Sequence, residues 1–447
     1  MTKQYSPINE NTDLILTKFS YLKNLGDEYW SFKNEYKRDH SHSYFRYPAM
    51  MVPQMIRKIL DEICEANPKI KHIHDPFVGS GTILTETMLR GLEFTGRDIN
   101  PLSILLCKVK AGPFFENAFT EKINSIKKTI KKDNSCLVDI EFRNRDKWFR
   151  EDVQISLAKI RRAIKKENSL WARRFFWVAF AETIRLVSNS RTTTYKLHIR
   201  EEEQINSRKI DVYKIFNNNL DNNFNQLKET RTYLKEKNLL KSDRYIKDIN
   251  LILGNAKEKL PEKYKFDVIL TSPPYGDNHT TVTYGQYSYL PLSWIDLKDI
   301  DSNASSKYLE TFSMIDKMSL GGERYKDKNK VSYLKKISPT YCKYYKVFRD
   351  KPKELIDKIT SFFYDLDETL HPLINNLNPG GYLIWTLGNR TVGGINIELD
   401  KILIELFKHR EISLIDIIYR PIPNKRMASK NKSTQTMTKE TILILKK

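Results

Sequence analysis

The passage from residue 69 to residue 101, KIKHIHDPFVGSGTILTETMLRGLEFTGRDINP, constrains the fold more than any other part of the chain. An apolar segment around Ile73 predicts a short strand, and the glycine-rich turn Gly79–Thr82 follows it. Ile83–Arg90 has the pattern of a helix, and Leu92–Asp98 reads as a second strand. A strand, a helix and a strand in this order predict two parallel strands joined by a crossover helix.

The same alternation returns in the last part of the chain, after a long segment of different character. Residues 246–447 contain the predicted strands YIKDINLILGNA, KFDVIL, NPGGYLIWTLGN, SLIDIIYR and TKETILILKK, and a long predicted helix at Lys351–Leu377. Residues 111–245 are rich in Lys, Arg, Asn and Glu, and four stretches there have helical periodicity: Ala118–Lys132, Val153–Lys166, Trp171–Val187 and Val212–Lys237. We therefore expect an α/β fold, with a mostly parallel sheet covered by helices on both faces and a largely helical insertion. The expected regions are 1–110, 111–245 and 246–447, the last with a loop-rich segment at 300–350.

Composition limits the class of protein and its partners. The 447 residues carry a formal net charge of +21, which favours a polyanionic partner such as nucleic acid over a merely solubilising basic surface. The four cysteines are far apart in the sequence, which argues against a zinc site and a disulfide framework. The N-terminus lacks an apolar signal core and no segment approaches membrane-spanning length, so we expect a cytoplasmic protein that uses no membrane.

The glycine-rich turn predicts a nucleoside site. DPFVGSGT follows a strand and opens a helix, so its backbone N–H groups face the carboxyl edge of the sheet. Gly79 and Gly81 let a ligand approach the backbone, and Thr82 is the expected N-cap of the helix. No Lys follows the second glycine, so the turn is not a triphosphate-binding loop. Asp98, at the end of the next strand, is suited to accept both hydroxyls of a ribose.

A second motif, TSPPYGD, ends the predicted strand 266–270. Pro273 and Pro274 cannot donate to a strand ladder and each fixes φ, so they make a rigid corner with Tyr275 at its tip. The alternative is a Pro-Pro turn of structural use alone, which its pairing with DPFVGSGT disfavours.

Together DPFVGSGT, GRDINP and TSPPY resemble the motifs of S-adenosylmethionine-dependent amino-methyltransferases that modify DNA. The resemblance implies a Rossmann-like sheet of seven strands. It also implies that S-adenosylmethionine is bound by Asp75, Phe77, Gly79, Gly81, Thr82 and Asp98, and that the target amine is held by Ser272, Pro273, Pro274 and Tyr275. The resemblance extends to LGNA, where Asn255 would meet the donor's adenine. It also includes YFRYPAMMVPQMI, where Tyr47 and Pro48 belong to the segment that covers the methionine half.

The corner suits the chemistry that this resemblance implies. An exocyclic amine is a poor nucleophile because its lone pair is delocalised into the base. Two rigid acceptors, Ser272 Oγ and the Pro273 carbonyl, would bind its hydrogens, and Tyr275 would offer a flat face to a base that has left its stack. In the resembling families, Ser at the first position favours the N4 amine of cytosine and Asp the N6 amine of adenine. Cytosine is therefore the preferred target, and adenine is the alternative.

The order of the motifs suggests where DNA is recognised. The glycine motif precedes the corner, which resembles the arrangement with a target-recognition region inserted between the two halves. We expect Arg191, Thr193 and Lys196 in the basic insertion to contact DNA, while the aromatic spacing in Trp171–Phe180 indicates a helix core face. His279 and Tyr284, after the corner, would contact the flipped base or its orphaned partner; alternatively, Tyr284 packs on the next helix. Residues 300–350 and the basic stretch Asn424–Lys432 are alternative DNA-contacting segments.

Two rival functions and one further partner are open. An RNA guanine amino-methyltransferase would usually have Asp before the prolines and an additional N-terminal domain, for which the sequence before Asp75 leaves little room. An inactive nucleic-acid-binding protein would not be expected to keep both motifs intact. A cognate restriction endonuclease is a candidate partner.

Overall fold

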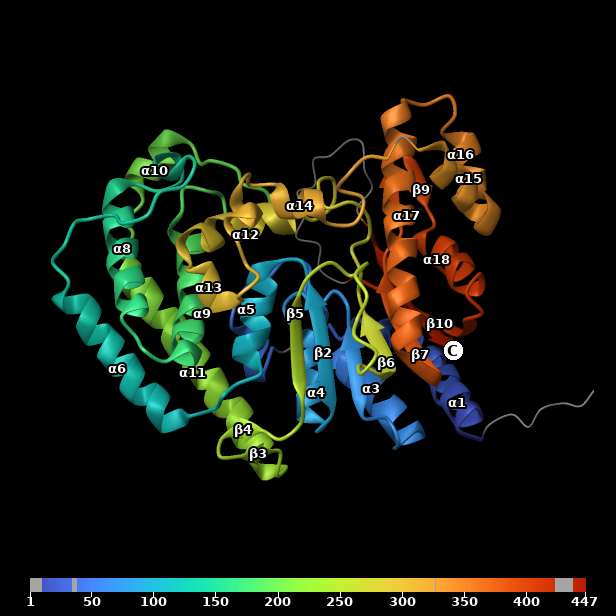
Figure 1. Ribbon diagram of the computed structural model, residues 1–447, viewed down its shortest axis with the longest axis horizontal. Helices are drawn as coiled ribbons and strands as arrows, with labels where there is room; N and C mark the ends of the chain where they lie inside the picture. Colours follow the sequence, from blue (N-terminus) through green and yellow to red (C-terminus); the bar gives the residue numbers. More distant parts are fainter. Residues whose placement is uncertain (1–9, 34–37, 326, 423–436) are drawn as a thin grey trace, which may run out of the picture.

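Figure 1 shows the computed structural model, which describes residues 10–33, 38–325, 327–422 and 437–447. Its centre is a seven-stranded sheet whose strands follow one another in the order β5 (Ile249–Leu253), β2 (Glu93–Asp98), β1 (His72–Asp75), β6 (Phe266–Thr271), β7 (Leu377–Leu387), β11 (Lys439–Lys446) and β10 (Ser413–Pro421). Neighbouring strands from β5 to β7 are parallel, and β11 is antiparallel to both of its neighbours. The predicted Rossmann-like, mostly parallel sheet is confirmed. The stretch Asn424–Lys432 lies outside the described residues.

Helices cover both faces of the sheet, because alternate side chains of each strand point to opposite sides. In β7, Tyr382 and Ile384 belong to one buried cluster and Leu383 and Trp385 to the other. The first cluster includes α1 (Glu10–Asn24), α3 (Pro53–Ala66), α4 (Thr82–Leu89) and α5 (Pro101–Lys110). The second includes α15 (Lys328–Ile337), α16 (Pro339–Val347), α17 (Lys353–Asn376) and α18 (Leu399–Lys408). In the part of the chain described here, no helix is both long and apolar enough to cross a membrane.

The insertion is helical, as its periodicity predicted, and lies beside the β5 edge of the sheet (Figure 1). Its helices are α6 (Glu116–Lys132), α7 (Arg145–Trp148), α8 (Glu151–Lys165), α9 (Leu170–Val187), α10 (Glu202–Ser207) and α11 (Val212–Glu236). Phe175, Phe176 and Phe180 are buried on α9, which confirms that these aromatic residues belong to the core. The insertion's buried residues are continuous with the first cluster of the sheet, so the insertion extends the core on that face.

Residues 300–350 differ from the expected loop-rich segment. α15 and α16 form a helical pair over α17, with Leu334 and Tyr341 fully buried there. Apolar side chains at helical spacing outweighed the many lysines of this stretch, most of which are exposed, while Lys330 and Lys335 lie over tyrosine rings. The loop-rich expectation is therefore wrong for residues 328–347.

The topology brings the two sequence motifs together. β2, the next strand in the chain, pairs with one edge of β1, whereas β6 pairs with the opposite edge of β1. Such a reversal opens a crevice at the carboxyl ends of the strands, where open α/β sheets bind ligands. The turn after β1 and the corner after β6 both lie at this edge.

Candidate functional site

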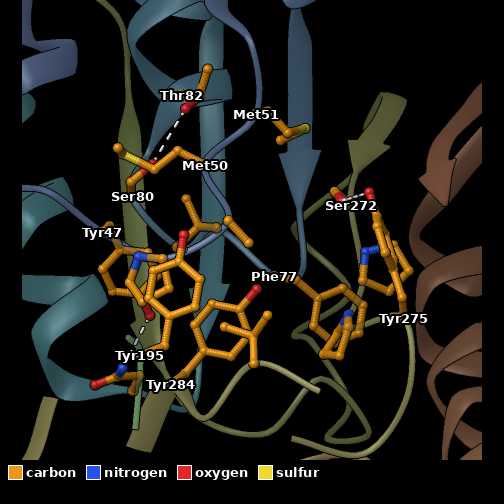
Figure 2. A pocket seen from close by; sticks show the side chains of 18 of the residues that line it. Tyr47, Met50, Met51, Phe77, Ser80, Thr82, Tyr195, Ser272, Tyr275 and Tyr284 are labelled. Atoms are coloured by element: carbon orange, nitrogen blue, oxygen red, sulfur yellow. Dashed lines mark hydrogen bonds between the residues drawn. The ribbon is translucent and has the colours of Figure 1, made fainter. Parts of the chain in front are cut away.

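A cavity of about 940 Å³ lies at the carboxyl edge of the sheet (Figure 2). Twelve residues predicted from sequence line it: Tyr47, Pro48, Phe77, Gly79, Thr82, Asp98, Asn255, Ser272, Pro273, Pro274, Tyr275 and Tyr284. Figure 2 shows Tyr47 at one end and Ser272 with Tyr275 at the other, with Phe77 between them. The predicted donor site and the predicted target site therefore share one cavity. Met50, Met51, Ser80 and Tyr195 also line it and were not singled out from the sequence.

The turn after β1 needs both of its glycines. Gly79 has φ +49° and Gly81 has φ +74°, a left-handed conformation that favours glycine. A Cβ on Gly81 would lie 2.9 Å from Cys107 Sγ, so Gly81 faces α5 and is not among the residues that line the cavity. Gly81 is the N-cap of α4 and Thr82 is its first residue, so the prediction of Thr82 as the N-cap is wrong. A residue with positive φ lies outside the helix, so Gly81 is the cap and the helix begins at Thr82, one residue earlier than predicted.

Asp98 lies at the cavity wall and organises the turn. Its carboxylate accepts hydrogen bonds from Gly79 N at 2.8 Å, Asn100 N at 2.9 Å and Ser103 Oγ at 2.9 Å. Burial raises the pKa of Asp98, and these donors oppose that shift. A carboxylate has about four acceptor positions, so three protein donors leave about one for a ligand. This is less than the two ribose contacts expected from the sequence.

Asp75 is fully buried and does not line the cavity. One of its oxygens accepts from Thr271 Oγ1 at 2.6 Å, at the end of β6, and from Phe77 N at 3.0 Å. Burial raises the pKa of Asp75 to about 7. Its contacts tie the turn Gly79–Thr82, which we call the donor turn after its predicted role, to the strand that ends in the corner. The structure does not place the Asp75 side chain in the cavity.

Two tyrosines form the wall near the donor turn. The Tyr47 and Tyr284 rings are stacked, with centroids 5.7 Å apart and an interplanar angle of 26°. The Tyr47 hydroxyl accepts from Asn100 Nδ2 at 3.0 Å. Tyr284 is also the first residue of α12 (Tyr284–Trp294). It therefore lines the cavity and begins the next helix, so both interpretations of Tyr284 retain support.

Asn255, after β5, also lines the cavity. Its side-chain oxygen accepts from Lys257 N at 3.0 Å, and its Nδ2 lies 3.5 Å from the carbonyl oxygen of Met318 in α14 (Met314–Met318). The segment that includes α14 thereby closes over the cavity beside Asn255.

The corner after β6 is held by residues from the far end of the chain. Ser272 Oγ lies 3.2 Å from the Tyr275 hydroxyl, which donates to Glu440 Oε1 at 3.0 Å. Glu440, on β11, forms an ion pair with Arg420, on β10. Arg420 Nε also donates to the carbonyl of Trp30 at 3.1 Å. Burial raises the pKa of Tyr275 well above its ordinary value, so the phenol keeps its proton.

Glu440 and Arg420 both line the cavity and were missed by sequence reasoning. Their sequence surroundings indicate strands and nothing more. Only the closing of the sheet brings them to the corner.

The residues expected to contact DNA are divided between the cavity and the surface. Arg191, Thr193 and Lys196 are exposed and are not among the cavity's lining residues. Arg191 forms an exposed ion pair with Glu201, with nitrogen and oxygen 2.7 Å apart. Tyr195, between these residues, lines the cavity. The segment that carries them therefore reaches the rim of the site.

The loop after the corner also contributes to the rim. Thr283 Oγ1 donates to the Tyr195 carbonyl at 3.2 Å, which links this loop to the insertion. His279 is partly buried, which lowers its pKa, and it does not line the cavity. Its neighbours Asn278 and Thr280 do.

Comparison with known proteins identifies the class to which this geometry belongs. Residues 57–337 match the family described as D12 class N6 adenine-specific DNA methyltransferase. The chain is also similar to the Type II methyltransferase M.MvaI of Kocuria varians, with 34% identity over 468 aligned residues and 98% of each chain covered. The family match covers more than half of the chain, and the similarity to M.MvaI extends over nearly all of it.

Proposed function

The chain belongs to the D12 class of DNA methyltransferases. From Ser272 at the first position of the corner, we propose that it methylates the N4 amine of a cytosine turned out of duplex DNA. The family establishes an S-adenosylmethionine-dependent DNA methyltransferase of the restriction-modification type. The base, its flipping and the role of each residue are the proposal. The observation that supports it is that the corner Ser272–Tyr275 and the donor turn line the same cavity.

The donor end fits S-adenosylmethionine in shape and polarity. Asp98 and Asn255 offer acceptors and donors for a nucleoside, and Tyr47 and Phe77 offer apolar walls. Gly79 leaves the backbone of the turn accessible. When bound there, the donor supplies an electrophilic methyl group. The residues of this end hold and orient it.

At the corner, the hydrogen bonds prepare Ser272 as an acceptor. The phenol of Tyr275 has one proton, and it donates that proton in a hydrogen bond to Glu440 Oε1. The Tyr275 oxygen therefore accepts from Ser272, whose hydroxyl proton points away from a substrate amine. The lone pairs of Ser272 Oγ are left to accept an amine hydrogen, and the Pro273 carbonyl would accept the other. This arrangement favours a pyramidal nitrogen with an exposed lone pair, and the two prolines keep it rigid.

Two observations favour different bases. Ser272 at the first position of the corner supports cytosine, as its resemblance to serine-type members implies. The description of the matched family supports the N6 amine of adenine, which is the second candidate and the one that the comparisons favour. Because that family acts on DNA, the RNA guanine alternative loses its support.

Nucleoside mass spectrometry of DNA methylated by the purified enzyme tests the proposal. N4-methylcytosine would support it, and N6-methyladenine would replace it by the second candidate. Methylation of a ring carbon would contradict the amine mechanism altogether.

For DNA contact we propose the exposed segment that contains Arg191, Thr193 and Lys196, together with His279 and Tyr284 near the target base. The link from Thr283 to the Tyr195 carbonyl supports this, because it holds the segment beside the loop after the corner. Arg191→Ala should weaken binding to duplex DNA.

We further propose a cytoplasmic location with the genome and a cognate restriction endonuclease as partner. The Type II name of the relative M.MvaI supports the endonuclease.

A further inference from the structure

A buried carboxylate with three cations lies next to the corner. Asp277 follows Tyr275 by two residues, and its side chain is 0% exposed. Three cationic groups from separate segments converge on its two oxygens: Arg324 at 3.2 Å, Lys358 of α17 at 3.4 Å, and Arg390 of β8 (Arg390–Val392) at 3.3 Å. We call these four residues the Asp277 cluster.

The Asp277 cluster contains more positive charge than Asp277 can neutralise. Among the residues that the structure describes, each of the three cations forms its ion pair with Asp277 and with no other carboxylate. One carboxylate against three cations leaves an excess of two positive charges. Burial lowers the pKa of Lys358 to about 8, and the charge of Arg390 acts in the same direction.

A purely structural role accounts poorly for this excess. A single cation would neutralise the buried carboxylate. Each additional one adds desolvation cost and repulsion without a partner of its own. The cluster is therefore organised to receive a further anion.

The cluster opens towards the space that the target strand would occupy. The Arg324 side chain is 33% exposed, and Arg390 lines the same cavity as the corner. Arg390 also lies directly against the corner loop, because a Cβ on Gly276 would be 1.6 Å from Arg390 Nη1. Any larger residue at position 276 would therefore clash with the Arg390 guanidinium. Arg390 Nη2 donates to Thr280 Oγ1 at 3.1 Å, which fixes its orientation.

We propose that Arg324, Lys358 and Arg390 bind a phosphodiester of the strand that carries the target base. The inference rests on the proposed function, since a base turned into the corner brings its flanking phosphates to the cavity rim. Guanidinium groups match the geometry of phosphate oxygens and remain charged at all working pH values. Asp277 holds the three cations in place before DNA arrives, so little reorganisation accompanies binding.

The test combines a change in the DNA with a change in the protein. A duplex containing the methylation site is made with a neutral methylphosphonate at each flanking phosphate in turn, and its binding is compared with that of the unmodified duplex. The variant is Arg324→Gln. Its matched control is Arg349→Gln, since Arg349 is 81% exposed and pairs with its chain neighbour Asp350.

One methylphosphonate should weaken wild-type binding by roughly tenfold, and Arg324→Gln should weaken binding to unmodified DNA to a similar extent. The variant should lose little more on the modified duplex, because the contact is already absent. Its slope of log affinity against log salt should be less steep by about one, as for one lost phosphate contact. Arg349→Gln should bind both duplexes as the wild type does.

Fully additive effects of Arg324→Gln and the methylphosphonate would overturn the inference, as would a variant that matches the Arg349→Gln control. If Arg324→Gln melts early, Arg324→Met takes its place, since it also removes the charge while its unbranched apolar side chain keeps the packing of the arginine stem. Wild-type enzyme on unmodified DNA separates this result from the proposed function. Failure to methylate any DNA amine would refute the function, whereas normal methylation with additive losses refutes the phosphate site alone.

Discussion

The turn after β1 and the corner after β6 leave neighbouring strands at the same edge of the sheet, yet they are stabilised by different parts of the chain. In the donor turn, Asp98 is bonded to Gly79, Asn100 and Ser103, all within a short stretch of sequence. In the corner, the Ser272–Tyr275 pair depends on Glu440, which lies 165 residues beyond Tyr275.

Under the proposed function, this difference separates binding from chemistry. A turn whose polar groups bond to one another is rigid before the donor arrives, and it has little acceptor capacity to spare. The corner leaves the lone pairs of Ser272 free, because Glu440 determines the direction of the hydrogen bonds. We therefore expect changes in the donor turn to alter donor affinity, and changes in the corner to alter the rate of methyl transfer.

Replacing Ser272 should have the largest effect. Ser272→Ala removes one proposed acceptor for the amine and leaves the turn after β1 intact, so the single-turnover rate of methyl transfer should fall by about ten- to a thousandfold. Affinities for S-adenosylmethionine and for DNA, measured by calorimetry and by anisotropy, should change little. A loss confined to donor affinity would show that the two regions do not divide the work in this way.

Replacing Asp98 should have the next largest effect, on binding. Asp98→Ala leaves Gly79 N and Asn100 N without their acceptor and removes the remaining ligand contact. Calorimetry should show donor binding weakened by about 1–3 kcal/mol. Ser103→Ala is the matched control, because it removes one neighbour of Asp98 and keeps the carboxylate. Equal losses in both variants would mean that Asp98 acts only through the turn.

The same contrast between local and distant contacts explains which parts of the fold and the site could be predicted from the sequence. The sheet, the helices of the insertion and the donor turn were predictable, because strand length, helical periodicity and positive-φ glycines are local properties. Twelve predicted site residues line the cavity. Asp75 was placed in the donor site by its position in the motif, whereas its side chain points into the interior and bonds to Thr271 on β6.

The remaining parts depend on contacts between distant segments. Glu440 and Arg420 reach the corner because β10 and β11 close one edge of the sheet, and no spacing in the sequence predicts that approach. The cations of the Asp277 cluster come from three segments, of which one, around Arg324, lies in the stretch expected to be loop-rich. Residues 328–347, within the same stretch, are helical because their apolar side chains recur at helical spacing.

The link from the corner to Glu440 can be tested without disturbing the base-stacking surface. Tyr275→Phe keeps the ring and removes the hydroxyl, so Ser272 loses the acceptor that directs its proton. The loss of one hydrogen bond predicts a rate about two- to tenfold lower, with unchanged affinity for DNA. Tyr275→Ala should in addition weaken binding of the target base by about 1–3 kcal/mol, because stacking is lost. If Tyr275→Phe methylates at the wild-type rate, the Glu440 contact plays no part in preparing Ser272.

The smallest expected effect concerns Asp75, which bonds to both regions through Phe77 N and Thr271 Oγ1. Its pKa is raised from an ordinary value of 3.8 to about 7 in the folded protein, because burial disfavours the charge. Below pH 4 both the folded and unfolded states are protonated, and the stability associated with neutral Asp75 is fully present. As pH rises towards 7 the unfolded chain loses the proton first, so this stability is progressively lost. Asp75→Asn stays neutral and lacks this dependence. Thermal melting from pH 4 to pH 8 should therefore show the wild-type melting temperature falling relative to that of the variant, and parallel curves would mean that Asp75 is already ionised when it joins the two strand ends.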